Sequence, residues 1–245
     1  MTLCTRFSAC VLVLFLCGSC HKTKTLGPCT GNCEVVHFTG KAFDPGGQKA
    51  LANLSVKVDM PRKQYCMYCG PYQVVAGSTK ADGTFDLTTT VDTTIVAAHY
   101  CTISVEGPGG YIVYAQPKGP GIADTPPAST VAWPLSVDST GMATYEEYDF
   151  FQPTLLTVRL HRTSAILLSE PFLGLTFNLS ASSTAAWEVN ETPANADTAL
   201  ILYTGANVFT RINYALYLTD STKEDRTDSI RCVPGGNNSI EIDYP

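Results

Sequence analysis

The feature that most constrains this chain is a recurring short run of alternating apolar and polar residues. These runs are rich in Val, Ile, Thr, Tyr and Phe, and Gly, Pro, Asp and Asn separate them. Successive side chains of a β-strand point to opposite faces, so such alternation fits strands that bury one face. No segment shows sustained 3.6-residue apolar periodicity with helix caps. The sequence therefore predicts an all-β protein made of antiparallel β-sandwiches.

The most regular runs lie in residues 34–118. Glu34–Asp44 ends at a Pro-Gly-Gly turn, and Leu51–Met60 alternates behind it. Asp82-Gly83 then separates two alternating runs, which predicts a β-hairpin. A further strand pair is predicted across Pro108-Gly109-Gly110. We expect residues 34–118 to form a first β-sandwich.

The order FTGKAFDPGGQKALANLSVKV, followed by GSTKADGTFDL, is similar to the carboxypeptidase regulatory-like, or prealbumin-like, β-sandwich. The positions that carry the resemblance are Gly40, Leu51, Asn53, Val56, Asp82, Gly83 and Phe85. The resemblance covers less than half of the chain. It implies a fold and an accessory or surface-presenting role, without catalytic residues.

The rest of the chain divides into a proline-rich stretch and a second group of strand-like runs. Residues 119–150 show little periodicity, which predicts a connection between domains. Trp133 lies in this stretch, and we expect it to pin the loop to the sandwich rather than to stack on a sugar. Residues 151–245 predict a second, immunoglobulin-like β-sandwich. Whether Leu155–Arg162 closes the first domain or opens the second stays open.

Residues 1–19 are typical of an export signal. Arg6 precedes an apolar run from Ala9 to Leu16, which is shorter than the about twenty residues that a membrane-spanning helix needs. Gly-Ser-Cys follows, an order that resembles the lipoprotein signal of the Bacteroidetes type, although Cys17 stands where Leu is usual. The resemblance implies cleavage before Cys20 and acylation of Cys20, with palmitate as one of the acyl groups.

Residues 20–33 would then form a lipid-anchored tether, and the membrane would be a partner through the lipid. His21, Lys22 and Lys24 stand where surface-exposed lipoproteins of this type often carry acidic residues, so a periplasm-facing location in the cell envelope is favoured. The formal net charge of −6 argues against nucleic acid as a partner, because phosphate binding needs a basic face.

Cysteines beyond the signal and the acylated residue form two close pairs and two single positions. They are Cys29, Cys33, Cys66, Cys69, Cys101 and Cys232. An even number in an oxidising compartment favours disulfides. Pairing within each close pair is the simplest arrangement, and it leaves Cys101 and Cys232 to pair or stay free.

Two alternatives exist for the close pairs. Cys29, Cys33, Cys66 and Cys69 could form a Cys₄ metal site, since CMYCG resembles the knuckle of rubredoxin-like sites. A redox dithiol is disfavoured because a C-x-x-C redox motif needs a βαβ context.

Asp followed by Ser or Thr and a small or apolar residue recurs along the chain. This pattern resembles the O-glycosylation sequon of Bacteroidetes envelope proteins. The acceptors would be Thr93, Ser139, Thr198, Ser221 and Ser229. Asp-Ser and Asp-Thr are also ordinary turn chemistry, so both interpretations stay open.

The sequence contains no G-x-S-x-G, H-E-x-x-H or phosphate-loop motif. We therefore expect no catalytic residue, no cofactor and no resident metal. The favoured function is a non-catalytic, lipid-anchored envelope protein that is a structural or binding module for a protein or glycan. The alternatives are a carbohydrate-binding surface lipoprotein of a glycan-uptake system, with the aromatics of residues 145–151 as candidates, and a Cys₄ metal-binding or redox protein.

Overall fold

The structure is a computed structural model. It describes residues 24–25, 27–60, 72–92, 101–118, 130–135, 146–163, 173–179, 187–191, 197–219 and 222–244. Every regular element in these ranges is a β-strand, so the predicted all-β fold is confirmed. No helix within the described ranges is long and apolar enough to cross a membrane.

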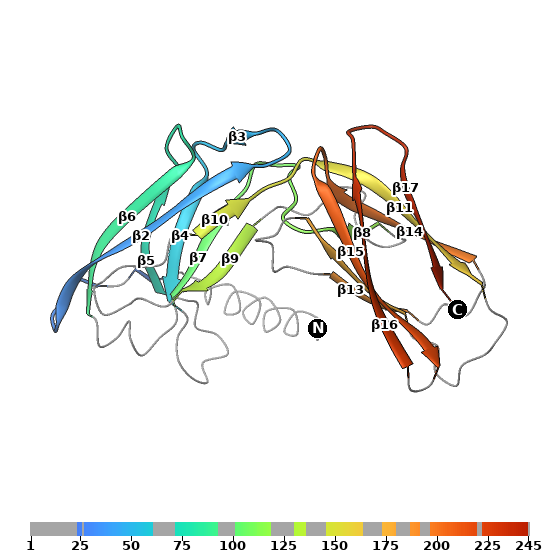
Figure 1. The fold of residues 1–245 in the computed structure, drawn as a ribbon. Helices are drawn as coiled ribbons and strands as arrows, with labels where there is room; N and C mark the ends of the chain where they lie inside the picture. Colours follow the sequence, from blue (N-terminus) through green and yellow to red (C-terminus); the bar gives the residue numbers. More distant parts are fainter. Residues whose placement is uncertain are drawn as a thin grey trace, which may run out of the picture.

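Two β-sandwich domains lie side by side (Figure 1). The strands of the first domain are β1 (Lys24–Thr25), β2 (Cys33–Asp44), β3 (Lys49–Ala50), β4 (Ser55–Met60), β5 (Tyr72–Ser78), β6 (Thr84–Asp92), β7 (Cys101–Glu106), β9 (Thr130–Leu135) and β10 (Glu146–Asp149). The strands of the second domain are β8 (Gln116–Pro117), β11 (Pro153–Arg162), β12 (Leu173–Asn178), β13 (Trp187–Glu191), β14 (Asp197–Gly205), β15 (Phe209–Thr219), β16 (Thr222–Arg231) and β17 (Asn238–Tyr244).

Both domains use one strand order. In the first, β2 lies between β10 and β6, and the facing sheet runs β5-β4-β7-β9. In the second, β11 lies between β17 and β14, and the facing sheet runs β13-β12-β15-β16. Apart from the short strands β1, β3 and β8, replacing each strand of the first domain by its counterpart in chain order reproduces the second, although no internal sequence repeat is visible.

This shared order corrects one expectation about the second domain. Numbered A to G along the chain, its strands divide into A, D and G on one sheet and B, C, E and F on the other. An immunoglobulin domain instead places A, B, E and D on one sheet and C, F and G on the other. The second sandwich therefore has the connectivity of the first rather than that of an immunoglobulin domain.

Alternation along the strands produces a separate hydrophobic core in each domain. In β2 the inward series includes Val36, Phe38 and Ala42, each with no exposed surface. In β11 the inward series is Leu156, Val158 and Leu160. The two cores share no residue, so each domain has its own hydrophobic contribution to stability.

The domain boundaries differ from the predicted ones. The expected connection 119–150 supplies β9, which pairs with β7, and β10, which pairs with β2. Residues 116–117, placed in the first domain by the sequence, pair with β14 of the second. Leu155–Arg162 belongs to the second domain, where it pairs with β14 and β17. Proline content therefore did not mark a linker.

The predicted Asp82-Gly83 hairpin is also wrong. The turn joins β5 to β6, but β5 pairs with β4 and β6 pairs with β2, so the chain crosses here from one sheet to the other. The strand pair expected across residues 108–110 is not formed either, because β7 pairs with β4 and β9. A tight turn specifies that the chain reverses but not which strand the next one joins.

Gly83 is the position at which this turn constrains the residue type. Its φ is +78°, and an added Cβ would lie 2.5 Å from the backbone oxygen of Ala42. The Gly83 oxygen also accepts a hydrogen bond from the Ala42 backbone N–H at 2.9 Å. A side chain at Gly83 would therefore press on the strand that the turn packs against.

We expect Gly83→Ala to lower the free energy of unfolding of the first domain by about 1–3 kcal/mol, from the left-handed backbone and the steric overlap. Urea unfolding of a Trp187→Phe background, followed through Trp133 on β9 of that domain, measures the change. Gly109→Ala is the matched control, since its Cβ would meet no atom within 4 Å. Equal unfolding midpoints for the two variants would contradict the expectation.

Candidate functional site: the junction between the domains

The two domains are interlocked by the path of the chain. After β7 the chain enters the second domain, where β8 pairs with β14. It then returns to the first domain for β9 and β10 before it leaves again at Phe151. The backbone N–H of Lys118 extends the β8 contact by donating to the oxygen of Ile201 at 2.7 Å. The connection between β7 and β9 therefore adds a strand to the neighbouring domain.

Ile112 and Ala115 fix this connection in the second domain. Both side chains are fully buried in its hydrophobic core. Ile112 and Phe151 form a β-bridge, each backbone N–H donating to the oxygen of the other at 2.9 and 2.8 Å. The neighbours Tyr111 and Val113 instead pack against the core of the first domain. One short segment thus contributes to both cores.

A buried carboxylate lies at the same junction. The alternation of β2 continues inward to Asp44, which has no exposed surface. Its Oδ1 accepts a hydrogen bond from the backbone N–H of Gly47 at 2.9 Å, and its Oδ2 accepts one from the Tyr111 hydroxyl at 3.2 Å. The Lys49 Nζ lies 3.8 Å from Oδ2. A buried carboxylate needs such partners because ionised groups lose hydration inside a protein.

The Asp44 cluster continues into the second domain. The Gln152 amide, just before β11, donates to the Tyr111 hydroxyl at 3.1 Å. The turn after β2, which contains Gly46, also lies against the turn after β14, which contains Ala206. A Cβ added at Gly46 would lie 2.1 Å from the backbone oxygen of Ala206. Backbone, core and side-chain contacts therefore all cross the junction.

The chemistry of the Asp44 cluster suits a structural contact that holds the two domains together. The pKa of Lys49 is raised by a hydrogen bond with Tyr111 and, to a smaller extent, by the charge of Asp44, so its ammonium form is favoured. The Lys49 Nζ also lies 5.7 Å from the centre of the Tyr111 ring, within the range of a cation–π contact. Donors and acceptors in the cluster face one another rather than a ligand.

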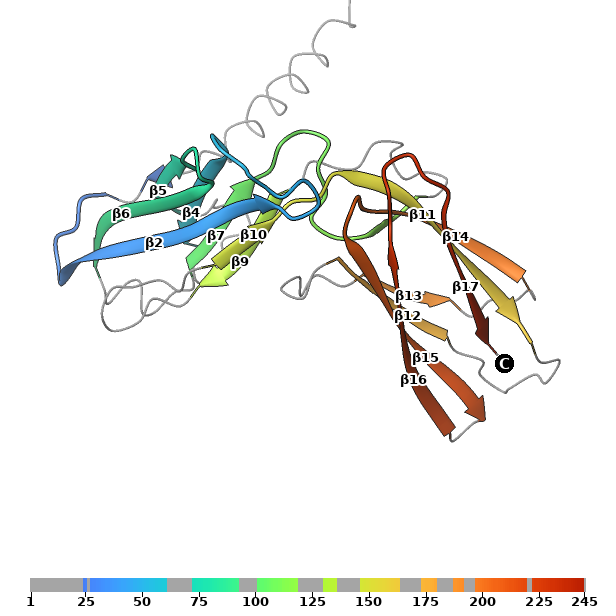
Figure 2. The same ribbon diagram turned by 45° about the horizontal axis from the view of Figure 1, so that its top comes forward.

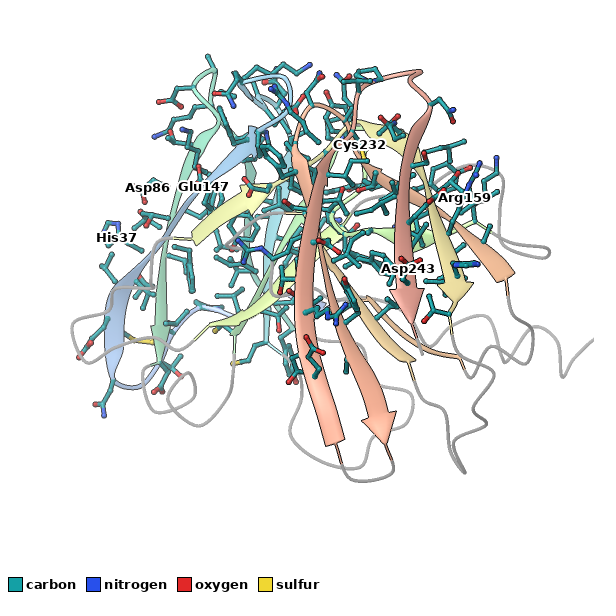
Figure 3. The ribbon with its side chains drawn as sticks, turned by 45° about the vertical axis from the view of Figure 1, so that its right-hand side comes forward. His37, Asp86, Glu147, Arg159, Cys232 and Asp243 are labelled. Carbon is teal, nitrogen blue, oxygen red and sulfur yellow. A yellow bond between two sulfur atoms is a disulfide. The ribbon has the colours of Figure 1, made fainter. Side chains whose placement is uncertain are left out.

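A second polar group lies on the outer face of β2 and β6 (Figure 3). The Thr88 hydroxyl is 3.2 Å and the Asp86 Oδ1 is 3.5 Å from the same Nδ1 of His37. A catalytic triad uses the two ring nitrogens for different partners, so this arrangement is not a triad. The sequence interpretation missed the group, although the alternation of Asp86 and Thr88 on one strand face was visible.

The cysteines divide into three cases. Cys29 and Cys33 form a disulfide, as local pairing predicts. Cys66 and Cys69 lie outside the described residues. The alternative Cys₄ site is contradicted because the disulfide occupies two of its four sulfurs. Among the described residues no group of His, Cys, Asp and Glu could hold a metal ion.

Cys101 and Cys232 are free and buried, so the pairing considered for them is not formed. The reason is their position: Cys101 belongs to the core of the first domain and Cys232 to the core of the second. Burial raises the pKa of the Cys101 thiol to about 11. Burial also raises the pKa of Cys232, against a smaller opposite effect of a hydrogen bond with Thr210.

Two of the modification candidates fall within the described residues. Thr198 is on β14, and Ser229 is on β16, where it is exposed. Thr93, Ser139, Ser221 and the acylation candidate Cys20 lie outside the described residues. Ser229 thus occupies a strand, although Asp-Ser was considered as turn chemistry.

Three of the aromatic candidates for glycan binding are placed differently from the expectation, and Tyr145 lies outside the described residues. Tyr148, Phe150 and Phe151 are at most 1% exposed and belong to the two cores. They cannot stack on a sugar without unfolding the domains. Trp133, expected in a loop, lies on β9.

No family model matches the chain, and no curated protein matches it. Its structural neighbours are β-sandwich proteins of the pilin and adhesin kind. Shaft pilin SpaA from Lactobacillus rhamnosus GG is 10% identical, with a TM-score of 0.26, over 87% of this chain and 98% of the pilin. A candidate adhesin from Bacteroides ovatus is 8% identical, with a TM-score of 0.30, over 90% of this chain and 99% of that one.

The chain also matches the Bacillus anthracis TIE protein at 12% identity and a TM-score of 0.27, but it spans only 33% of that protein's length. At these TM-scores the similarity concerns the β-sandwich class and carries no conclusion about function.

We expect Ile112→Ala to lower the free energy of unfolding of the second domain by about 2–5 kcal/mol, the usual range for truncating a buried Ile. Trp187 lies on β13 of that domain, so urea unfolding of a Trp133→Phe background reports on it. Ile201→Ala is the control, because the Ile201 side chain is 44% exposed. If both variants unfold at the same urea concentration, the shared segment does not stabilise the second domain.

We also expect Cys101 and Cys232 to resist iodoacetamide in the folded protein at mildly alkaline pH, because a buried thiol with a raised pKa forms little thiolate. Peptide mapping after alkylation gives the labelling of each cysteine separately. Both should become labelled once the protein is unfolded in urea. Rapid labelling of either residue before unfolding would show that its core opens readily.

Proposed function

We propose that this chain is a non-catalytic protein of the cell envelope, anchored to a membrane by a lipid on Cys20. In this proposal the two domains are a structural or binding module that holds a partner protein or glycan at a distance from the membrane. The interlocked junction is the observation that carries the proposal. Ile112 lies in the core of the second domain, and its neighbour Tyr111 packs against the core of the first domain. These two residues therefore resist separation of the domains.

The direction of the chain supports a spacer role. β2 begins at the end of the first domain far from the junction, and β11 and β17 run away from the junction through the second domain (Figures 1 and 2). The tether side and the carboxyl end of the described residues therefore lie at opposite ends of the two domains. An anchor on one end would present the other end away from the membrane.

The disulfide supports an oxidising compartment. Cys29–Cys33 joins the segment between β1 and β2 of the first domain to the first residue of β2, within the residues expected to form the tether. Disulfides persist in the bacterial periplasm and at cell surfaces and are rare in the cytosol. This agrees with the export signal expected in residues 1–19.

A binding role for glycan has less support than a structural or protein-binding role. The aromatics of residues 148–151 that were candidates for stacking are buried. The long outer strand β16 is instead lined with charged residues at Glu224, Asp225 and Arg226. Charges on an exposed edge strand discourage unspecific pairing with other strands. A partner is therefore expected to be recognised by specific side chains.

Lipid anchoring is tested with Cys20→Ala in an export-competent bacterial host. The unchanged protein should enter the detergent phase of a phase separation, and its intact mass should include acyl groups. The variant should lose the acyl mass and move to the aqueous phase, because in this proposal the lipid on Cys20 is the anchor. Cys10→Ala, inside the apolar run of the signal, is the control and should keep both properties. An unchanged acyl mass in the Cys20 variant would overturn the proposal.

A further inference from the structure

In each domain the first long strand, β2 or β11, and the last strand, β10 or β17, are neighbours and run parallel. β2 pairs with β10 through four registers, from Gly40↔Glu146 to Phe43↔Asp149. β11 pairs with β17 through seven registers, from Leu156↔Asn238 to Arg162↔Tyr244. Parallel pairing of the strands by which a chain enters and leaves a domain has a mechanical consequence.

After its return to the first domain for β9 and β10, the chain enters the second domain again at the start of β11 and leaves it at the end of β17. Because the two strands are parallel, these points lie at opposite ends of the pair. Tension along the chain therefore slides one strand past the other and loads all of their hydrogen bonds together. Tension on two points at the same end would instead break the bonds one after another.

We propose that this protein bears tensile force along its chain and that the β11–β17 pair is its main mechanical clamp. The proposal rests on the proposed function, since only a protein anchored at one end and bound at the other is under tension. The β2–β10 pair is the weaker clamp of the first domain because its register is shorter.

The core resists sliding of β17. Ile242 is 1% exposed and packs in the same core as Val158 and Leu160. A slip of one residue would turn the inward side chains of β17 to solvent, because side chains alternate between the faces of a strand. β11 is held on its other side by nine registers with β14, so β17 is the strand that must move.

Polar contacts add resistance at both ends of the clamp. At its start, the Asn238 amide donates to the backbone oxygens of Leu155, at 2.9 Å, and Val233, at 3.1 Å. Towards its end, Arg159 and His161 face Glu241 and Asp243 across the pair, at 3.8 and 3.5 Å. Figure 3 labels Arg159 and Asp243. These two side-chain contacts are exposed and contribute little each, whereas Asn238 is a buried residue.

Load passes directly from one clamp to the next. The backbone N–H of Phe150 donates to the oxygen of Phe43 at 2.9 Å, which continues the β2–β10 pairing up to the junction. Phe151 then bridges Ile112, and the oxygen of Gln152 accepts a hydrogen bond from Ala206 at 2.8 Å. No long linker separates β10 from β11, so the domains are loaded in series.

Single-molecule force spectroscopy of residues 21–245 tests the clamp by changing only the pulling direction. One azide-bearing residue is introduced at position 152 and a second at either position 245 or position 237. DNA handles are attached to the azides, so the native cysteines stay unchanged. Residues 152 and 245 load the β11–β17 pair in shear. Residues 152 and 237 lie at the same end of the pair and peel it open. We expect a several-fold higher unfolding force in shear.

Pulling the same chain from residue 21 to residue 245 tests the ranking of the two clamps. Each unfolding step lengthens the chain by about 3.3–3.6 Å per residue released, which identifies the domain that opened. We expect the first domain to open at the lower force and the second at the higher. Equal forces in the shear and peel geometries, or earlier opening of the second domain, would overturn the proposal.

These measurements need no membrane, so they are independent of the anchor. Equal unfolding forces in the shear and peel geometries would contradict the clamp but not the proposed lipid-anchored module. A failure of acylation at Cys20 would remove the source of tension but would not alter the measured forces.

Discussion

The arrangement of this protein depends on the burial of Ile112 and Ala115 in the core of the second domain. Both residues belong to the connection between β7 and β9, two strands of the first domain. Without this burial the connection between β7 and β9 would lose its apolar hold on the second domain. With it, the Asp44 cluster is held between the domains, because Tyr111 is the direct neighbour of Ile112 and donates to the carboxylate. Apolar burial thus positions the polar contacts of the junction.

The same junction determines how force would travel. β10 ends where β11 begins, and the bridge between Ile112 and Phe151 lies between them. Each domain has a parallel pair between its first long strand and its last strand, so the geometry that resists tension occurs twice in series. In the proposed function, the junction and the β2–β10 and β11–β17 strand pairs together transmit load from one end of the chain to the other.

Local features of this protein could be predicted from the sequence where the interaction is local. The strand predicted at Glu34–Asp44 is observed as Cys33–Asp44, and the short separation of Cys29 and Cys33 made their disulfide the simplest pairing. The turn at Asp82-Gly83 is observed with its positive φ at Gly83. The predicted pairing of the strands on either side of that turn was wrong, because pairing depends on partners such as β2 that lie far away in sequence.

Alternation by itself determined that this chain forms strands with one buried face, and turn residues determined where the chain reverses. Only the tertiary structure decided which strands pair, that a proline-rich stretch supplies β9 and β10, and that Cys101 and Cys232 lie in separate cores. The physical reason is that strand period and turn geometry are set by neighbouring residues, whereas a sheet is closed by hydrogen bonds between distant segments, and many pairings satisfy the same alternation.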